Sequence, residues 1–205
     1  MITMISRNNT NIEGNIFDKY HTKNKLYNYL MKIFISSFLT LAKSSKVESI
    51  LEVGCGEGEM TKIISENVKG CRINASDISF NIVKKAKQQF PNYNFSIQSI
   101  YNLPYRDNEF DLVVACEVLE HLENPSKALM EINRVCKKYF IVSVPNKPIW
   151  RILNILRGKY IKSLGNTPSH IQHWGPNKFK KLVSNYFTIS KITLPFPWIM
   201  ILCEK

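Results

Sequence analysis

The chain has 205 residues, 44% of them hydrophobic and 21% charged, a composition typical of one globular domain with one core. No apolar run is long enough to span a bilayer, and the polar residues 1–14 lack the apolar stretch of a secretory signal. We therefore expect a cytoplasmic protein without a membrane span.

The formal net charge of +12 permits nucleic acid, an anionic membrane surface or an anionic substrate as a partner. Nucleic acid is not favoured, because lysine outnumbers arginine, whereas recognition of bases and phosphates usually relies on arginine. The five cysteines are dispersed and form no Cys-x-x-Cys pair, which indicates reduced structural thiols. Nothing in the pattern indicates an oligomeric state.

Apolar periodicity and the placement of Gly and Pro predict alternating helices and strands. Strands are predicted at 49–53, 72–76, 94–99, 110–116, 139–144, 187–194 and 198–203. A first helix is expected from Phe17, with an apolar face formed by Leu26, Leu30, Ile33, Phe34, Phe38 and Leu41. Further helices are expected from the glycines to about Val68, from Ser79 to Pro91, and over 125–135, 149–156 and 178–185.

Alternating strands and helices require right-handed crossovers and therefore a parallel sheet covered on both faces. A short turn, Pro195-Phe196-Pro197, joins the last two strands, so the final strand is expected to run antiparallel. We predict a doubly wound, seven-stranded α/β sheet in a single domain over 1–205. Ligands of such sheets bind at the carboxyl ends of the strands.

A glycine-rich turn follows the first predicted strand, in the sequence Ile50-Leu-Glu-Val-Gly-Cys-Gly-Glu-Gly58. Its glycines favour a close approach of the backbone to a ligand, although a purely structural turn is the alternative. Glu59 stands where a dinucleotide fingerprint has its third glycine, which favours an adenosine ligand without a pyrophosphate. Asp77 ends the second strand, where it can accept both ribose hydroxyls or serve as an acid at the next helix N-terminus.

From Ile50 to Val144 the chain resembles class I S-adenosylmethionine-dependent methyltransferases, in particular the branch that includes ubiquinone and menaquinone biosynthesis methyltransferases. The matching segments are ILEVGCGEGEM, ASDIS, LPYRDNEFDLVVACEVLEHLENP, ALMEINRVCK and FIVSVPN. The resemblance implies a Rossmann-like fold, S-adenosylmethionine as cofactor and S-adenosylhomocysteine as product. It also implies an N-terminal helical lid (1–46), a cofactor-binding core (47–145), and an acceptor-side insert with a C-terminal hairpin (146–205).

The resemblance implies a role for each matching residue. The residues expected to bind the cofactor are Tyr20, Glu52, Gly54, Cys55, Gly56, Gly58, Asp77, Ile78, Ser99, Ile100 and Glu117. Among them Asp77 would hold the ribose, Ile78 would face the adenine, and Tyr20 would belong to the lid over the cofactor. Ser99 stands where many relatives have Asp, and Glu117 would lie beside the sulfonium.

Glu117, Glu120 and His121 are spaced i, i+3 and i+4, so one helical turn would place them on one face. In one interpretation Glu117 orients the cofactor and the other two hydrogen-bond locally. In a second, His121 is the general base. In a third, which is not the favoured one, the three bind a divalent metal, because Glu-x-x-Glu-His resembles the metal-binding stretch of some quinone O-methyltransferases and small-RNA 2′-O-methyltransferases. His170 and His173 either complete such a site or form loop hydrogen bonds.

The favoured function is methyl transfer to O, N or C of a small-molecule or lipid-like acceptor. The alternatives are an RNA methyltransferase and a catalytically inactive, cofactor-binding partner protein. The basic and apolar insert from Lys147 to Lys162 is interpreted as a mobile lid, as a contact with a membrane surface, or as a helix that buries its apolar face on the sheet. The lid interpretation predicts an apolar or amphipathic acceptor with an anionic or polar head.

Overall fold

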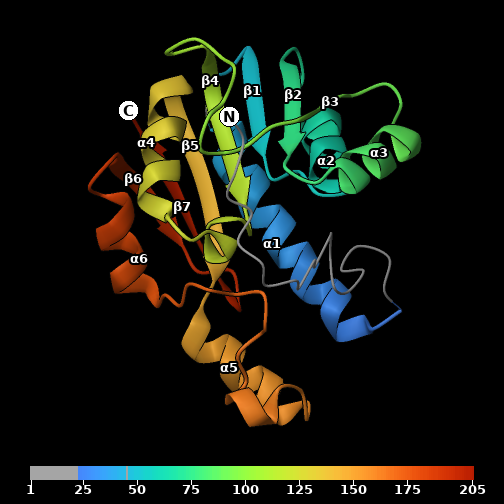
Figure 1. Cartoon of the computed structure of the whole chain (residues 1–205), viewed down its shortest axis with the longest axis vertical. Helices are drawn as coiled ribbons and strands as arrows, with labels where there is room; N and C mark the ends of the chain where they lie inside the picture. The colour runs from blue at the N-terminus through green and yellow to red at the C-terminus, as the bar shows by residue number, and fades with distance from the viewer. Residues whose placement is uncertain (1–22, 45) are drawn as a thin grey trace, which may run out of the picture.

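Seven strands form one mixed sheet in the order β3-β2-β1-β4-β5-β7-β6 (Figure 1). The computed structural model describes residues 23–44 and 46–205. The strands are β1 (Ser49–Val53), β2 (Arg72–Asp77), β3 (Asn94–Ile97), β4 (Phe110–Cys116), β5 (Cys136–Pro145), β6 (Thr188–Thr193) and β7 (Trp198–Glu204). Strand β7 is antiparallel to both of its neighbours, whereas all other pairs are parallel. The predicted doubly wound sheet with an antiparallel last strand is confirmed.

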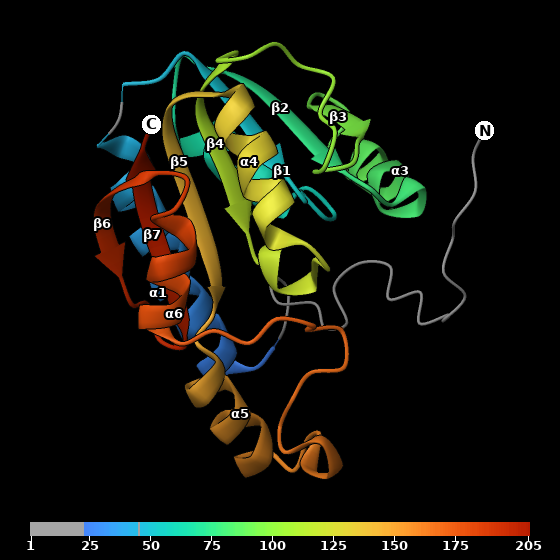
Figure 2. The same ribbon diagram turned by 60° about the vertical axis from the view of Figure 1, so that its left-hand side comes forward.

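Helices cover both faces of this sheet (Figures 1 and 2). They are α1 (Lys25–Lys43), α2 (Glu59–Asn67), α3 (Phe80–Gln89), α4 (Pro125–Val135), α5 (Lys147–Leu156) and α6 (Pro176–Val183), with the short 3-10 helices η1 (Leu119–His121) and η2 (Ile161–Ser163). Among the described residues, no helix is both long and apolar enough to cross a membrane.

Alternate side chains of the central strands enter two separate hydrophobic clusters. In β5, Phe140 and Val142 pack in the cluster of α4 and α6, whereas Ile141 between them packs in the cluster of α1 and α2. The same alternation in β7 places Met200 on the α1 side and Ile201 on the other. Because both faces are buried, the sequence shows runs of apolar residues and not a strict alternation, at 140–142 in β5 and at 198–203 in β7.

Helix α1 begins later than its sequence pattern suggests. Asn24 is the N-cap, and its side chain accepts a hydrogen bond from the Tyr27 N–H at 3.2 Å. This capping bond fixes the first helical residue as Lys25, so the helix is not continuous from Phe17. The rest of the prediction, over residues 17–22, lies outside the described residues.

The packed face of α1 is also shorter than predicted: full burial begins at Met31, and Tyr27 and Leu30 before it are only partly buried against the same core. Leu26, which the sequence assigned to this face, is exposed. Phe34 and Phe38 are buried, and the ring of Phe34 lies 5.0 Å from that of Trp198. This half of α1 therefore belongs to the core, while a lid role for the N-terminal segment 1–46 stays a prediction.

Other element boundaries differ from the predictions by a few residues. Strand β3 ends at Ile97, not at Ser99. Pro176 starts helix α6, as this proline indicates in the sequence, and the helix ends at Val183, two residues before the predicted end at Asn185. These shifts leave the order of the elements unchanged.

Candidate cofactor and acceptor site

The glycine-rich turn follows β1 at the carboxyl edge of the sheet. Gly54 and Gly58 have φ angles of +71° and +89°, a left-handed region that residues with a side chain rarely adopt. A Cβ at Gly58 would lie 2.7 Å from Cζ of Phe95. The Cys55 N–H donates to the Ser76 carbonyl of β2 at 2.9 Å, which ties the turn to the neighbouring strand. The backbone of the turn is thus fixed and lacks bulky side chains at its corners.

Asp77 lies beside this turn at the end of β2. Its Oδ2 accepts from the Gly56 N–H at 3.1 Å, and its Oδ1 accepts from the Ser79 N–H at 3.0 Å. Helix α3 is capped by Ser79, whose hydroxyl accepts from the Ile82 N–H, and not by Asp77. A carboxylate offers roughly four acceptor positions, so Asp77 can accept further hydrogen bonds while it holds the turn.

Glu52, which precedes the turn, is buried, so its side chain does not line an open cavity. The hydroxyl of Thr61 donates to its carboxylate. Burial raises the pKa of Glu52 to about 8, the Thr61 hydrogen bond opposes this rise, and the charge of Asp77 adds to it. Burial also raises the pKa of the Cys55 thiol. Both groups are therefore predominantly neutral near pH 7.

The residues expected around the adenine lie where β2 and β3 end. The Gln98 N–H donates to the Asp77 carbonyl at 3.0 Å and joins the two strand ends. Ile78 is exposed at this junction, so its side chain is accessible to a ligand. Ser99 lies beyond the end of β3, where its hydroxyl accepts from the backbone two residues on. Ile100 packs partly buried against the core.

Glu117 is held at the end of β4 by partners from two other strands. Its N–H donates to the Ser143 carbonyl of β5 at 3.0 Å, and its Oε2 accepts from the indole Nε1 of Trp198 at 2.8 Å. Its φ of +61° is left-handed, and η1 begins only at Leu119. The prediction that one helical turn aligns Glu117 with Glu120 and His121 is therefore wrong, because Glu117 lies outside the helix that contains the other two.

Glu120 and His121 instead meet His170. Ligand atoms of these three side chains lie within 4.8 Å of one another, and Glu117 is not part of the group. The Glu120 carbonyl accepts from the N–H groups of Ile171 and Gln172 at 2.9 and 3.0 Å. These bonds hold the irregular segment before α6 against η1. The group that the structure brings together thus contains His170, whereas the alternative metal set considered from the sequence contained Glu117.

Lys147, expected among the exposed charges of the insert, is buried with only 3% of its surface exposed. It is the first residue of α5, and its N–H donates to the Trp174 carbonyl at 3.0 Å. Its Nζ has no hydrogen-bond partner among the described residues. Burial lowers its pKa to about 8, although the charges of Glu120 and Glu117 oppose this effect.

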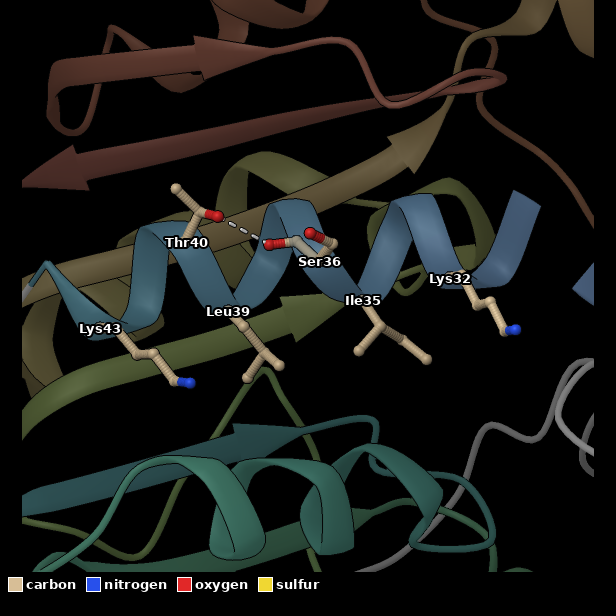
Figure 3. A pocket seen from close by; sticks show the side chains of 6 residues that line it. All are labelled: Lys32, Ile35, Ser36, Leu39, Thr40 and Lys43. Atoms are coloured by element: carbon tan, nitrogen blue, oxygen red, sulfur yellow. Dashed lines mark hydrogen bonds between the residues drawn. The ribbon is translucent and has the colours of Figure 1, made fainter. Parts of the chain in front are cut away.

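A cavity of about 400 Å³ lies along the outer side of α1 (Figure 3). Its lining residues all come from this helix: Lys32, Ile35, Ser36, Leu39, Thr40 and Lys43. None of the residues described above belongs to it, so it is not part of the candidate site.

The central part of the chain is similar to known proteins. Residues 51–142 match the family model described as a methyltransferase domain. This match supports a methyltransferase domain of class I over these residues. An uncharacterized methyltransferase of Schizosaccharomyces pombe is 36% identical to this chain over 103 residues, which cover 45% of the chain and 37% of the relative.

Two further proteins show the likeness over a larger part of the chain. A ubiquinone/menaquinone biosynthesis C-methyltransferase of Rickettsia akari is 27% identical over 135 residues, 60% of the chain and 54% of the relative. The magnesium protoporphyrin IX methyltransferase of Synechocystis, solved with bound S-adenosylhomocysteine, shares the fold with a TM-score of 0.68 at 18% identity, over 90% of the chain and 89% of that protein. The chain spans less than two thirds of the curated relatives' length.

The candidate site also contains residues that sequence reasoning missed. Trp198 binds Glu117 from 81 positions away, and no local signal links the two. Lys147 was recognised only as a charge of the insert. Tyr20, assigned to the lid over the cofactor, lies outside the described residues, and its role stays a prediction.

Proposed function

We propose that this chain transfers the methyl group of S-adenosylmethionine to an oxygen, nitrogen or carbon of a small-molecule or lipid-like acceptor. The observation that carries the proposal is the hydrogen bond between the Gly56 N–H and Asp77, which places the glycine turn and a carboxylate side by side at adjacent strand ends. This pairing suits the ribose and the unphosphorylated side of an adenosine. The magnesium protoporphyrin IX methyltransferase with bound S-adenosylhomocysteine supports the same cofactor.

The residues of the turn fit such a cofactor chemically. Asp77 would accept the ribose hydroxyls, and the exposed Ile78 would lie against the adenine ring. Glu117 ends β4 next to β1, where it would face the positively charged part of the cofactor. When bound, the cofactor supplies a methyl group that is already activated on a sulfonium. The protein then contributes mainly alignment, which is worth roughly 7–11 kcal/mol in well-oriented reactions.

His121 is the proposed base for acceptors that must lose a proton. Its Nδ1 lies 2.9 Å from the Ser169 carbonyl, which can only accept, so the neutral ring carries its hydrogen on Nδ1. Nε2 then holds a lone pair, 4.0 Å from Oε1 of Glu120. This tautomer can take a proton from an acceptor hydroxyl or amine and return it to solvent after transfer.

Binding of S-adenosylhomocysteine, followed by titration calorimetry, tests the cofactor part of the proposal. Asp77→Ala should weaken binding by roughly 1.5–3 kcal/mol, the usual scale for a hydrogen bond to a charged group. Asp77→Asn, which keeps the shape and one acceptor oxygen, should lose less, and Glu66→Ala on the exposed side of α2 should bind like the wild type. No binding of either form of the cofactor, together with tight NAD binding, would contradict the proposal.

Metal-assisted transfer is a second candidate, favoured by the convergence of Glu120, His121 and His170. One carboxylate and two imidazoles suit a divalent ion, which would polarise an acceptor hydroxyl. Chelator should then abolish methylation, and Mg2+, Mn2+ or Zn2+ should restore it. His170→Ala removes one of the three ligands and should weaken metal binding by at least about 10–100-fold, the loss caused by removing a residue that only supports a ligand. The control is His173→Ala, outside the cluster, and full turnover in excess chelator would leave His121 as the base.

A further inference from the structure

Residues 146–175, between β5 and α6, project from the end of the sheet (Figures 1 and 2). Trp150 anchors this projection, since its ring lies 5.8 Å from that of Trp198 in the body of the protein. Asn154 Nδ2 donates to the Gly165 carbonyl at 2.8 Å, and Arg151 Nε donates to the Leu164 carbonyl at 2.9 Å. These bonds join α5 to the segment that contains η2, so the two form one unit.

Large aliphatic side chains remain exposed on this unit. Their exposed fractions range from 44% to 77%, and we call them the α5 patch: Ile152, Ile155, Leu156, Ile161 and Leu164. The interpretation that the insert buries its apolar face on the sheet is therefore wrong for these residues. Several exposed aliphatic residues gathered on one unit indicate an interaction surface, whereas single ones need no explanation.

The charges around the α5 patch are all of one sign. Residues 146–175 contain no Asp and no Glu. Arg151, Arg157, Lys159 and Lys162 lie on the same unit, and none of them is buried. Aliphatic residues flanked by cations complement an anionic bilayer: the aliphatic side chains contact the acyl chains, and the cations contact the headgroups. Single-stranded or double-stranded nucleic acid would use the cations but would leave the aliphatic side chains in water.

We propose that the α5 patch docks on the surface of a bilayer that contains anionic lipid. Lys147 starts α5 immediately after β5, so docking would hold the carboxyl edge of the sheet, with its acceptor side, close to the lipid. The proposal concerns a surface outside the cofactor residues, and it can fail while methyl transfer stands. Each basic residue near an anionic membrane strengthens binding by about fivefold, so the charges add to the contribution of the aliphatic residues.

Co-sedimentation of the full chain with vesicles tests this proposal. We expect binding to phosphatidylcholine vesicles that contain phosphatidylglycerol, weak binding to pure phosphatidylcholine, and loss of binding at high salt. Leu156→Ser removes the most exposed aliphatic side chain and should weaken binding about tenfold. The matched control is Met130→Ser, which removes an exposed apolar side chain from α4 and should leave binding unchanged.

Other outcomes would overturn the proposal. Equal binding of Leu156→Ser and wild type, or no preference for phosphatidylglycerol, would show that the α5 patch does not meet anionic lipid. A concentration-dependent dimer that Leu156→Ser abolishes would assign the surface to a second copy of the chain. Calorimetry with S-adenosylhomocysteine on the same variant separates the two proposals, because Leu156→Ser should bind this ligand like the wild type.

Discussion

Replacing Glu52 with glutamine should flatten the pH dependence of stability between about pH 4.5 and 8. Burial raises the pKa of Glu52 from 4.5 to about 8 in the folded protein. The folded state therefore keeps a proton that the unfolded chain releases, and stability is fully present below pH 4.5 and is lost as pH rises through about 8. Glutamine is neutral at every pH and has a similar shape, and its carbonyl still accepts the Thr61 hydroxyl.

The size of the effect follows from the two pKa values. One pKa unit corresponds to about 1.4 kcal/mol, so the wild type should lose on the order of 4 kcal/mol across this range, relative to the variant. For a domain of this length, 1 kcal/mol corresponds to roughly 2–4 °C in Tm, so the difference should approach about 10 °C. Asp111 does not interfere: burial raises its pKa, but the Glu48 N–H and Lys138 outweigh burial and lower the pKa to about 2, below the range.

Thermal unfolding followed by circular dichroism from pH 5 to 8 measures this difference. The wild type should lose Tm steadily as pH rises, whereas Glu52→Gln should change much less. Glu66→Gln, an exposed position on the same helix as Thr61, is the control and should follow the wild type. Parallel curves for wild type and Glu52→Gln would refute the argument that Glu52 is protonated in the folded protein.

Two further substitutions test how the turn and α4 are held. Gly58→Ala should lower the free energy of unfolding in urea by roughly 2–4 kcal/mol, because a left-handed φ is combined with a clash against Phe95. The control is Gly70→Ala, which has a positive φ but open space around it and should lower the free energy of unfolding by about 1–2 kcal/mol. Arg134→Met should cost roughly 2–4 kcal/mol because Arg134 binds Glu131 and two loop carbonyls; a loss below 1 kcal/mol would show that these contacts are dispensable.

The fold was predictable because its signals are local and repeat. Strand β4 is apolar from Leu112 to Cys116, a run that is typical of a strand buried on both faces. Proline at 125 and at 176 marks the starts of α4 and α6. The glycines after β1 and the acid after β2 lie at adjacent strand ends in any sheet of this topology, so their proximity followed from the strand order.

The acceptor side was less predictable because it depends on pairings between distant segments. The indole of Trp198 reaches Glu117 only because β7 pairs antiparallel with β5, with Trp198 opposite Pro145. His170 lies in an irregular segment whose position is set by backbone bonds to Glu120. Helical spacing suggested a different set of side chains, because it could not show that Glu117 adopts a left-handed conformation.

Lys147 provides the sharpest test of whether the acceptor side is built for function or for stability. Its pKa falls from 10.5 to about 8 because burial outweighs the charges of Glu120 and Glu117, while Arg151 lowers it further. The folded state then disfavours the ammonium, so the stability of the wild type relative to Lys147→Met should rise as pH increases from about 8 to 10.5. Below pH 8 we expect Lys147→Met to be the more stable protein, by a few kcal/mol in urea unfolding, whereas Lys162→Met, at an exposed position, should change little. If Lys147→Met is less stable than the wild type at pH 7, and the difference does not vary up to pH 10, then Lys147 serves the fold. If Lys147→Met is more stable but transfers methyl groups more slowly, then the buried cation is kept for the acceptor at the expense of stability.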